Sequence, residues 1–394
     1  MTESVDPATF PWRRPLRPRD PSQSHRQATF LELLFDLCFV VAIAYAGAGL
    51  HHAIVANHAG TGVASYLTVF FAIWWAWMNF SWFASAYDND DGIHRLATMV
   101  QIAGALILAA GIPRAFELRQ FDVAFVGYAV MRTGLGFLWL RAARADPARR
   151  RTCMRFATGI TAAMFGWAVM LVAGEWPLWG WWLMAIVELA VPVWAEQAAP
   201  TPWHPHHIAE RYGLFTIIVL GESVLAATHA VRLGVEGHGF SVPLLGLIGG
   251  GLVILFSLWW IYFAKPAHRF LTSNRVAFVW GYGHYFIFAA AAAVGAGLAV
   301  SVDHILGEAA IDGGLAAASV SLPVALFMTM VWLLHVRPHH ARLGLSFLFP
   351  VAIVLVLAAT FCPWPVPAIG AIVTAFLGIE LWQADQRYRR LPAA

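Results

Sequence analysis

The chain has 394 residues, of which 60% are hydrophobic and only 12% are charged, and its formal net charge is +3. Soluble domains carry roughly 25% charged residues, and a mean hydropathy of +0.65 is too high for one water-soluble core. The composition also excludes a disordered chain, a secreted domain held by disulfides and a nucleic-acid-binding domain, because polar low-complexity stretches, a cysteine framework and a basic stripe are all missing.

The apolar residues occur in blocks of about 18 to 25 residues, the length at which a helix crosses a hydrocarbon core of about 30 Å. We therefore predict an all-α polytopic bundle of about 12 transmembrane spans. The first block contains Glu32 and Asp36, which a cleavable signal peptide would exclude, so we expect this span to be retained. In chain order the predicted spans are 31–50, 64–85, 96–112, 122–140, 156–173, 178–195, 209–230, 241–263, 277–300, 316–335, 343–361 and 364–382.

Lysine and arginine gather in alternate loops of this arrangement, as in the arginine run 149–151 before the fifth span. Cytoplasmic loops collect these residues. We therefore expect a multi-pass protein of the cell (inner) membrane with both termini in the cytoplasm.

Two similar tryptophan-rich runs, 72–77 in the second span and 256–261 in the eighth, indicate an internal repeat. Either the chain contains two six-span halves, as many transporters do, or tryptophan pairs recur by chance in a tryptophan-rich chain. The predicted organisation is a basic cytoplasmic segment 1–30, a first half 31–195, a His/Pro-rich connector 196–208, a second half 209–382 and a basic tail 383–394.

Acidic residues inside the first span are candidates for a functional site. A charge at the centre of a bilayer costs about 2.5 to 3.5 kcal/mol on insertion scales, so it normally faces the interior of a bundle and has a partner. Glu32 and Asp36 are one helical turn apart and share one face. Their repulsion would be relieved by a positive group, a bound cation or a shared proton. Alternatively, Glu32 reaches the headgroup region and only Asp36 is buried.

The seventh span places Arg211, Glu222 and His229 on one helical face, with Glu222 near the middle of the span. We expect Glu222 to point into the bundle, because an ionisable group facing lipid would be costly.

Arg132 lies near the centre of the fourth span and Glu188 lies inside the sixth. Pairing of Arg132 with Glu222, Glu188 or Asp36 would neutralise these charges, either as a working pair or as a structural one. We expect the buried charges to gather around one water-filled chamber. The predicted ion or substrate relay consists of Glu32, Asp36, Arg132, Glu188, Arg211, Glu222 and His229.

A polar cluster precedes the seventh span. If its helix begins near His207, then His204, His206, His207 and Glu210 could ligate a divalent metal such as zinc, iron or manganese, and no other cofactor is expected. The alternative is helix capping and interfacial hydrogen bonding. The acidic loop 87–91 lacks the full calcium-loop pattern, so we interpret it as a solvated turn.

Three segments resemble the low temperature requirement A (LtrA) family of bacterial membrane proteins. They are the run 24–41, the tryptophan-rich second span continuing into 87–91 and Arg95, and the run 207–223. The resemblance implies a membrane protein and no particular activity. It adds weight to Glu32, Asp36, Glu210, Arg211 and Glu222.

These features favour an ion-coupled secondary transporter of a small solute. The sequence contains no P-loop motif, so we do not expect direct coupling to ATP hydrolysis. One alternative is an integral-membrane enzyme that acts on a lipid or isoprenoid near the cytoplasmic headgroups. Another is a sensor or scaffold without turnover. The expected partners are the lipid bilayer and a small solute or ion, with no nucleic acid, and the sequence does not indicate an oligomeric state.

Overall fold

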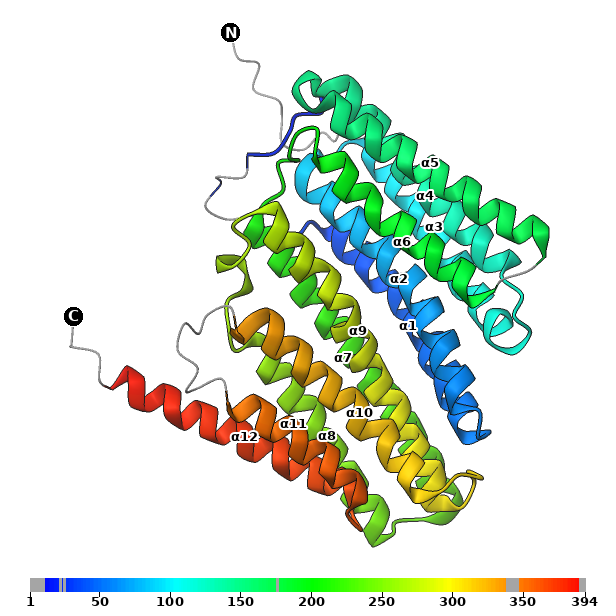
Figure 1. Ribbon diagram of the computed structural model, residues 1–394, viewed down its shortest axis with the longest axis vertical. Helices are drawn as coiled ribbons and strands as arrows, with labels where there is room; N and C mark the ends of the chain where they lie inside the picture. The colour runs from blue at the N-terminus through cyan, green and yellow to red at the C-terminus, as the bar shows by residue number, and fades with distance from the viewer. Residues whose placement is uncertain (1–10, 21–22, 24–25, 175–176, 338–346, 390–394) are drawn as a thin grey trace. The chain divides into compact units, whose positions relative to one another are not determined.

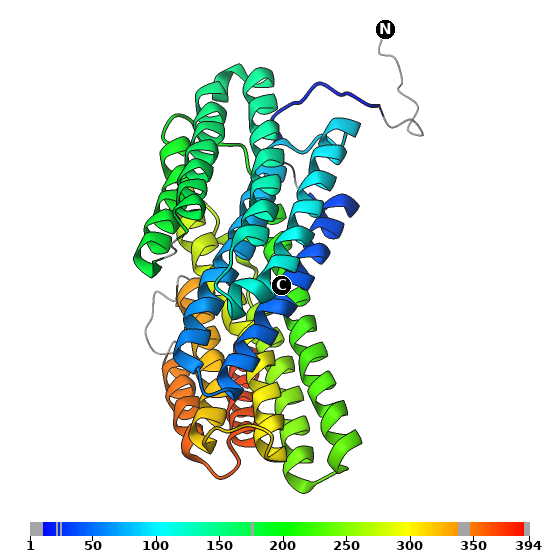
Figure 2. The same ribbon diagram turned by 90° about the vertical axis from the view of Figure 1, so that its right-hand side faces the viewer.

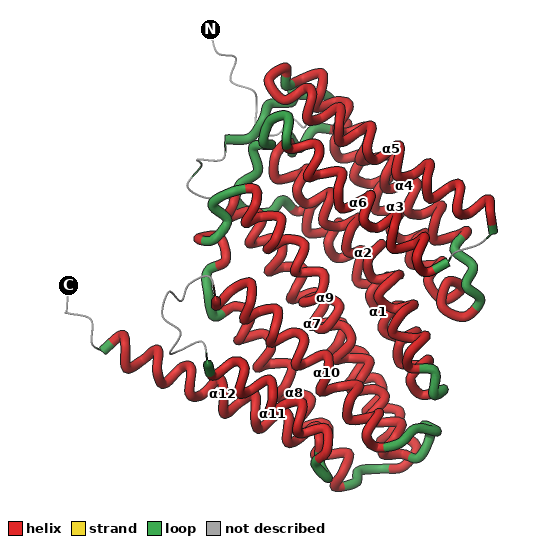
Figure 3. Tube along the Cα trace, viewed as in Figure 1, coloured by secondary structure: helices red, strands yellow, loops and turns green. Residues whose placement is uncertain are grey.

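The structure is a computed structural model that describes residues 11–20, 23, 26–174, 177–337 and 347–389. These residues form helices, turns and loops and contain no strand (Figure 3), which confirms the all-α prediction. The chain divides into two compact units: unit 1 comprises Met1–Tyr45 and Thr68–Tyr212, and unit 2 comprises Ala46–Leu67 and Gly213–Ala394.

Unit 1 is a bundle in which consecutive helices pack on one another, α3 on α4, α4 on α5 and α5 on α6 (Figure 1). The tightest approach is between α3 and α4, where a Cβ added to Gly127 would lie 2.2 Å from the backbone nitrogen of Leu108. Small residues allow membrane helices this proximity. Unit 1 contains the first part of α1 (Phe30–Val55), the second part of α2 (Ala59–Tyr87), α3 (Gly92–Glu117), α4 (Asp122–Ala145), α5 (Arg150–Ala173), α6 (Leu178–Glu196) and the start of α7 (Pro205–His238).

Unit 2 is built around α9, in which every residue from 287 to 302 is buried. α9 packs against α10, and α8 packs against α12 (Figures 1 and 2). Unit 2 contains the remaining parts of α1, α2 and α7, then α8 (Val242–Phe263), α9 (Asn274–Leu306), α10 (Gly313–Val331), the π-helix η3 (Trp332–Val336), α11 (Leu348–Ala358), the 3-10 turn η5 (Ala359–Phe361) and α12 (Pro365–Tyr388).

Side-chain caps fix where several helices begin. Asp91, Ser241, Ser273 and Asp312 each accept a hydrogen bond from a backbone N–H in the first turn of α3, α8, α9 and α10, respectively. These caps satisfy donors that a helix leaves open at its N-terminus. The short polar loops of the sequence therefore end one apolar helix and start the next.

Eleven helices of the described chain are long and apolar enough to cross a membrane, so the prediction of a polytopic helical bundle is confirmed. The shorter apolar segment Leu348–Phe361 lies in the predicted span 343–361. It would extend only about 21 Å as a helix, less than a hydrocarbon core. Residues 343–346 of that span lie outside the described residues. The twelfth crossing and the cytoplasmic location of the termini stay predictions.

The boundary between the units falls inside α7, between Tyr212 and Gly213, and further boundaries fall inside α1 and α2. The units are therefore not continuous segments like the predicted halves 31–195 and 209–382. An internal duplication stays a prediction.

Candidate functional site

A cluster of buried ionisable side chains in unit 1 joins the N-terminal ends of α1 and α7. It consists of Glu32 and Asp36 from α1 and His207 and Arg211 from α7, and we call it the ion cluster. All four residues are at most 1% exposed. The structure thus brings together three residues of the predicted relay and one of the predicted metal ligands.

Arg211 is the centre of the ion cluster. Its Nε donates to Asp36 Oδ2 at 3.0 Å, its Nη2 donates to Asp36 Oδ1, and its Nη1 donates to Glu32 Oε1 at 3.0 Å. Trp77 of α2 donates from Nε1 to Asp36 Oδ1 at 2.7 Å. The guanidinium therefore neutralises the repulsion that the adjacent carboxylates would otherwise feel, in the bidentate geometry that arginine favours.

Glu32 is both a helix cap and a charge partner. Its Oε2 accepts from the backbone N–H of Thr29 at 2.7 Å, and Thr29 Oγ1 accepts from the N–H of Glu32 at 3.3 Å, which is a capping box. His207 Nε2 lies 3.1 Å from Glu32 Oε1. Glu32 is therefore buried together with Asp36, which contradicts the alternative in which only Asp36 is buried.

Arg26 adds a second positive charge next to Glu32, with Nη2 at 4.0 Å from Oε1. It donates to the carbonyls of Ala84, at 2.9 Å, and Ser85. Burial lowers the pKa of Arg26 to about 10, although the Glu32 carboxylate acts in the opposite direction. Arg26 therefore remains protonated at neutral pH and shares in the charge balance.

Arg132 pairs with Glu188, one of the three partners that the sequence allowed. Both side chains are buried. Glu188 also accepts from Tyr128 Oη at 2.8 Å, from Trp75 Nε1 at 3.0 Å and from Trp167 Nε1 at 3.3 Å. Four donors therefore saturate the Glu188 carboxylate, as in a structural ion pair, whereas Nε and Nη1 of Arg132 are buried without a hydrogen bond in the described chain.

The expectation of one chamber shared by all the buried charges is wrong for these two groups. Trp75 points to Glu188, and Trp77, two residues later on α2, points to Asp36. Residues two apart lie on nearly opposite faces of a helix. α2 therefore separates the Arg132–Glu188 pair from the ion cluster.

Glu222 belongs to unit 2 and is 6% exposed, as expected for a residue that points into the bundle. No hydrogen bond or ion pair joins it to another residue of the described chain. A Cβ added to Gly47 of α1 would lie 4.0 Å from Glu222 Oε2, so glycine leaves room beside the carboxyl group. The adjacent Ser223 donates to the carbonyl of Ala291 at 2.9 Å, which fixes α7 against α9. His229 is exposed.

The four predicted metal ligands have separate surroundings. α7 begins at Pro205, slightly before the predicted start. His204 Nε2 contacts the carbonyl of Gln23 at 2.7 Å, and its Nδ1 accepts from the N–H of His207 at 3.3 Å, so His204 acts as a cap. Oε2 of Glu210 is buried and has no hydrogen bond within the described chain. No group of three His, Cys, Asp or Glu residues placed to hold a metal occurs among the described residues, His206 included.

The acidic loop after α2 is not the solvated turn that we expected. Asp88 and Asp91 are at most 2% exposed. Asp91 caps α3 and pairs with Arg141, and it also accepts from the backbone N–H of Arg14 at 2.8 Å. Burial raises the pKa of Asp91, but the hydrogen bonds from Arg141 and from the two backbone N–H groups lower it by more. The net result is a pKa of about 2. The loop is a structural anchor.

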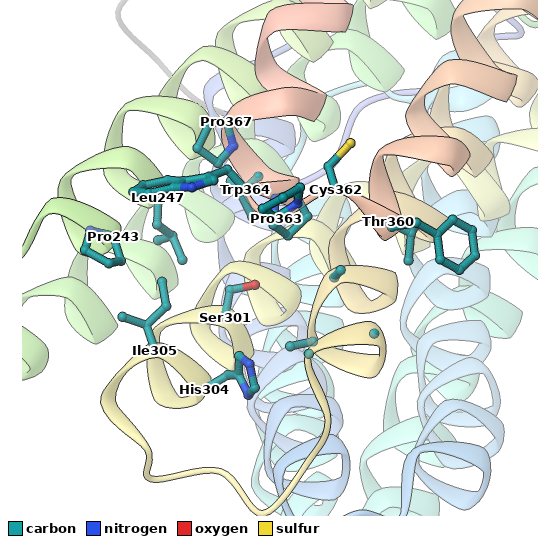
Figure 4. A pocket seen from close by; sticks show the side chains of 17 residues that line it. Pro243, Leu247, Ser301, His304, Ile305, Thr360, Cys362, Pro363, Trp364 and Pro367 are labelled. Carbon is teal, nitrogen blue, oxygen red and sulfur yellow. The ribbon is translucent and has the colours of Figure 1, made fainter.

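A cavity of about 710 Å³ lies in unit 2, between the start of α8, the end of α9, the start of α10 and the turn before α12 (Figure 4). Among the described residues, its lining contains no Asp, Glu, Lys or Arg. Ser301 and His304 point into it from α9, opposite the indole of Trp364. The cavity therefore offers an apolar wall and a few polar groups, as sites for small organic molecules do.

Sequence reasoning missed one polar group in unit 2. His284 of α9 and His335 of η3 are buried within apolar spans, and Tyr262 of α8 contacts His284. The sequence criterion that identified the carboxylates, an ionisable side chain inside an apolar span, would also have identified these two histidines.

The model of the bacterial low temperature requirement A protein (LtrA) family matches residues 27–378. An uncharacterized protein of Rhizobium meliloti (strain 1021) is 28% identical over 268 residues, which cover 64% of this chain and 62% of the relative. The match thus spans less than two thirds of the relative's length. No solved structure matches the chain. Because the family model covers most of the residues, the chain belongs to the bacterial LtrA family of multi-pass membrane proteins.

Proposed function

We propose that the protein is a cation-coupled secondary transporter of a small solute, with Glu222 as the coupling site. The observation that carries this proposal is Glu222, a residue that is 6% exposed and whose carboxyl group has no hydrogen bond or ion pair within the described chain. An unpaired carboxylate in a membrane interior costs several kcal/mol. Binding a proton or a cation removes that cost, so this group is suited to loading and unloading an ion.

The other acids of the predicted relay are less suited to this role, because each already has a positive partner. Asp36 and Glu32 share Arg211, and Glu188 is paired with Arg132. Buried pairs of this kind fix helices relative to one another. We assign the ion cluster and the Arg132–Glu188 pair to positioning α1, α2, α4, α6 and α7, and not to ion transfer.

The cavity in unit 2 is the candidate site for the solute. Its volume of about 710 Å³ is in the range of pockets that hold small organic ligands. Since His304 and Cys362 are the only titratable residues in the described lining, we propose a neutral or weakly charged solute with an apolar part that packs against Trp364.

Labelling with dicyclohexylcarbodiimide tests the coupling site without knowledge of the solute. This apolar reagent adds to a protonated carboxyl group, and the product rearranges to a stable N-acylurea that mass spectrometry detects. We expect labelling of Glu222, a decrease in labelling as the pH is raised, and no labelling of the paired Glu188. E222Q removes the signal, and E236Q at an exposed carboxylate leaves it unchanged. Absent labelling at Glu222, or equal labelling at Glu188, contradicts the proposal.

A further inference from the structure

Besides Glu222, unit 2 contains a cluster of three buried ionisable side chains: His284 of α9, His335 of the π-helix η3 and Tyr262 at the end of α8. Their exposed fractions are 0%, 1% and 4%. We call His284 and His335 the imidazole pair. Single π turns occur frequently at functional sites, and this one carries His335 to within 3.3 Å of His284, Nε2 to Nε2.

Hydrogen bonding fixes the neutral tautomer of His284. Its Nδ1 lies 2.7 Å from the carbonyl oxygen of Trp280. A carbonyl only accepts, so Nδ1 carries the hydrogen and Nε2 of the neutral ring has a lone pair. That lone pair faces Tyr262 Oη at 3.0 Å as well as Nε2 of His335.

Two donors therefore compete for one acceptor, because either the Tyr262 hydroxyl or an Nε2–H of His335 can bond to His284 Nε2. Once an incoming proton has bound Nδ1 of His335 and made that ring an imidazolium, a proton can pass between the imidazoles with little movement of heavy atoms. The N–H bond at His335 Nε2 breaks as the N–H bond at His284 Nε2 forms, which leaves His335 neutral with its hydrogen on Nδ1. Tyr262 extends this chain to α7, since its oxygen accepts a hydrogen bond from Thr216.

The titratable groups that face one another here are the two imidazoles, from α9 and η3, and the phenol of Tyr262, from α8. α7 contributes Thr216, which does not titrate in this range. Thr216 precedes Glu222 on the same helix by six residues, a rise of about 9 Å and a rotation of about 240° around the helix axis. The polar chain therefore reaches α7 less than two helical turns before the proposed coupling site.

We propose that the imidazole pair, through Tyr262 and Thr216, is a proton relay that serves Glu222, and that the coupled cation is accordingly a proton. This inference rests on the proposed function. Histidine suits the task because a neutral imidazole has one N–H donor and one lone pair, so it can take up a proton at one ring nitrogen and release one from the other. Chains of such groups mark proton pathways in membrane proteins.

The test is the charge movement after a pH jump on protein adsorbed to a solid-supported membrane, with the proton itself as the probe. A proton that enters from water and reaches a buried carboxyl group moves charge across part of the membrane. We expect a transient current that E222Q abolishes. H335Q and Y262F should slow the current about tenfold, while the final carbodiimide labelling of Glu222 stays unchanged. H229Q, at an exposed histidine of the same helix as Glu222, is the matched control.

The outcomes separate the two proposals. An unchanged rate in both H335Q and Y262F, with Glu222 still labelled, overturns the relay and leaves the coupling site intact. Absent labelling of Glu222 in the wild type overturns both. A merely structural role of the pair would lower the amount of folded protein or the labelled fraction and not the rate alone. Y262F keeps the ring and its packing, so it tests the relay even if H335Q does not fold.

Discussion

Replacing Arg211 by methionine tests the ion cluster most severely. The variant R211M keeps most of the side-chain volume but removes three charged hydrogen bonds to Asp36 and Glu32. After this change Glu32 still has Arg26 at 4.0 Å, whereas Asp36 loses its arginine partner. Removing one partner of a buried ion pair typically costs about 3 to 5 kcal/mol. We expect a loss of this size in the free energy of unfolding.

The assay is unfolding in mixed detergent micelles, followed by fluorescence of the 19 tryptophans. The matched control is R232M, because Arg232 forms an exposed pair with Glu236. Exposed pairs of this kind contribute about 0.5 kcal/mol. The double variant R211M/D36N removes the stranded charge of Asp36, so it should be more stable than R211M alone. Equal stability of R211M and R232M would refute the reasoning.

Three further predictions use the same unfolding assay. E188Q leaves Arg132 buried without a counter-charge and should cost about 3 kcal/mol. D91N should cost about 1 to 2 kcal/mol at neutral pH. Because the pKa of Asp91 is lowered to about 2 in the folded state, its contribution is fully present above the unfolded pKa of about 4 and disappears as the pH falls through about 2, so the two melting curves should converge there. G297A places a Cβ 2.1 Å from a backbone oxygen of α10 and should cost about 1 to 3 kcal/mol, whereas G136A meets nothing within 4 Å and should be neutral or slightly stabilising.

The helices were predictable because hydropathy and length determine which segments prefer lipid. Each of the twelve predicted spans coincides with a helix, and the residual disagreement is at 343–361, where the described apolar helix is short. The shared face of Glu32 and Asp36 was also predictable, since it depends only on the helical repeat.

Partner choice was not predictable, because it depends on tertiary packing. Arg211 pairs with Asp36, which lies 175 residues away in the sequence. Arg132 pairs with Glu188, one of three candidate partners that the sequence allowed. The prediction of a single chamber was wrong because α2 lies between the ion cluster and the Arg132–Glu188 pair. The hydrophobic periodicity of the sequence does not show which helix separates two groups. The acidic loop 87–91 was misinterpreted for a similar reason, since its burial depends on Arg141 of α4.

Transport itself is tested most directly by what the protein accumulates. Proteoliposomes are incubated with a bacterial metabolite extract, with and without an imposed proton gradient, and the trapped contents are compared by mass spectrometry. We predict that at least one small solute accumulates in wild-type vesicles only when the gradient is present, and that E222Q abolishes this accumulation while E236Q does not. Identical contents in wild-type, E222Q and protein-free vesicles would contradict the proposed function.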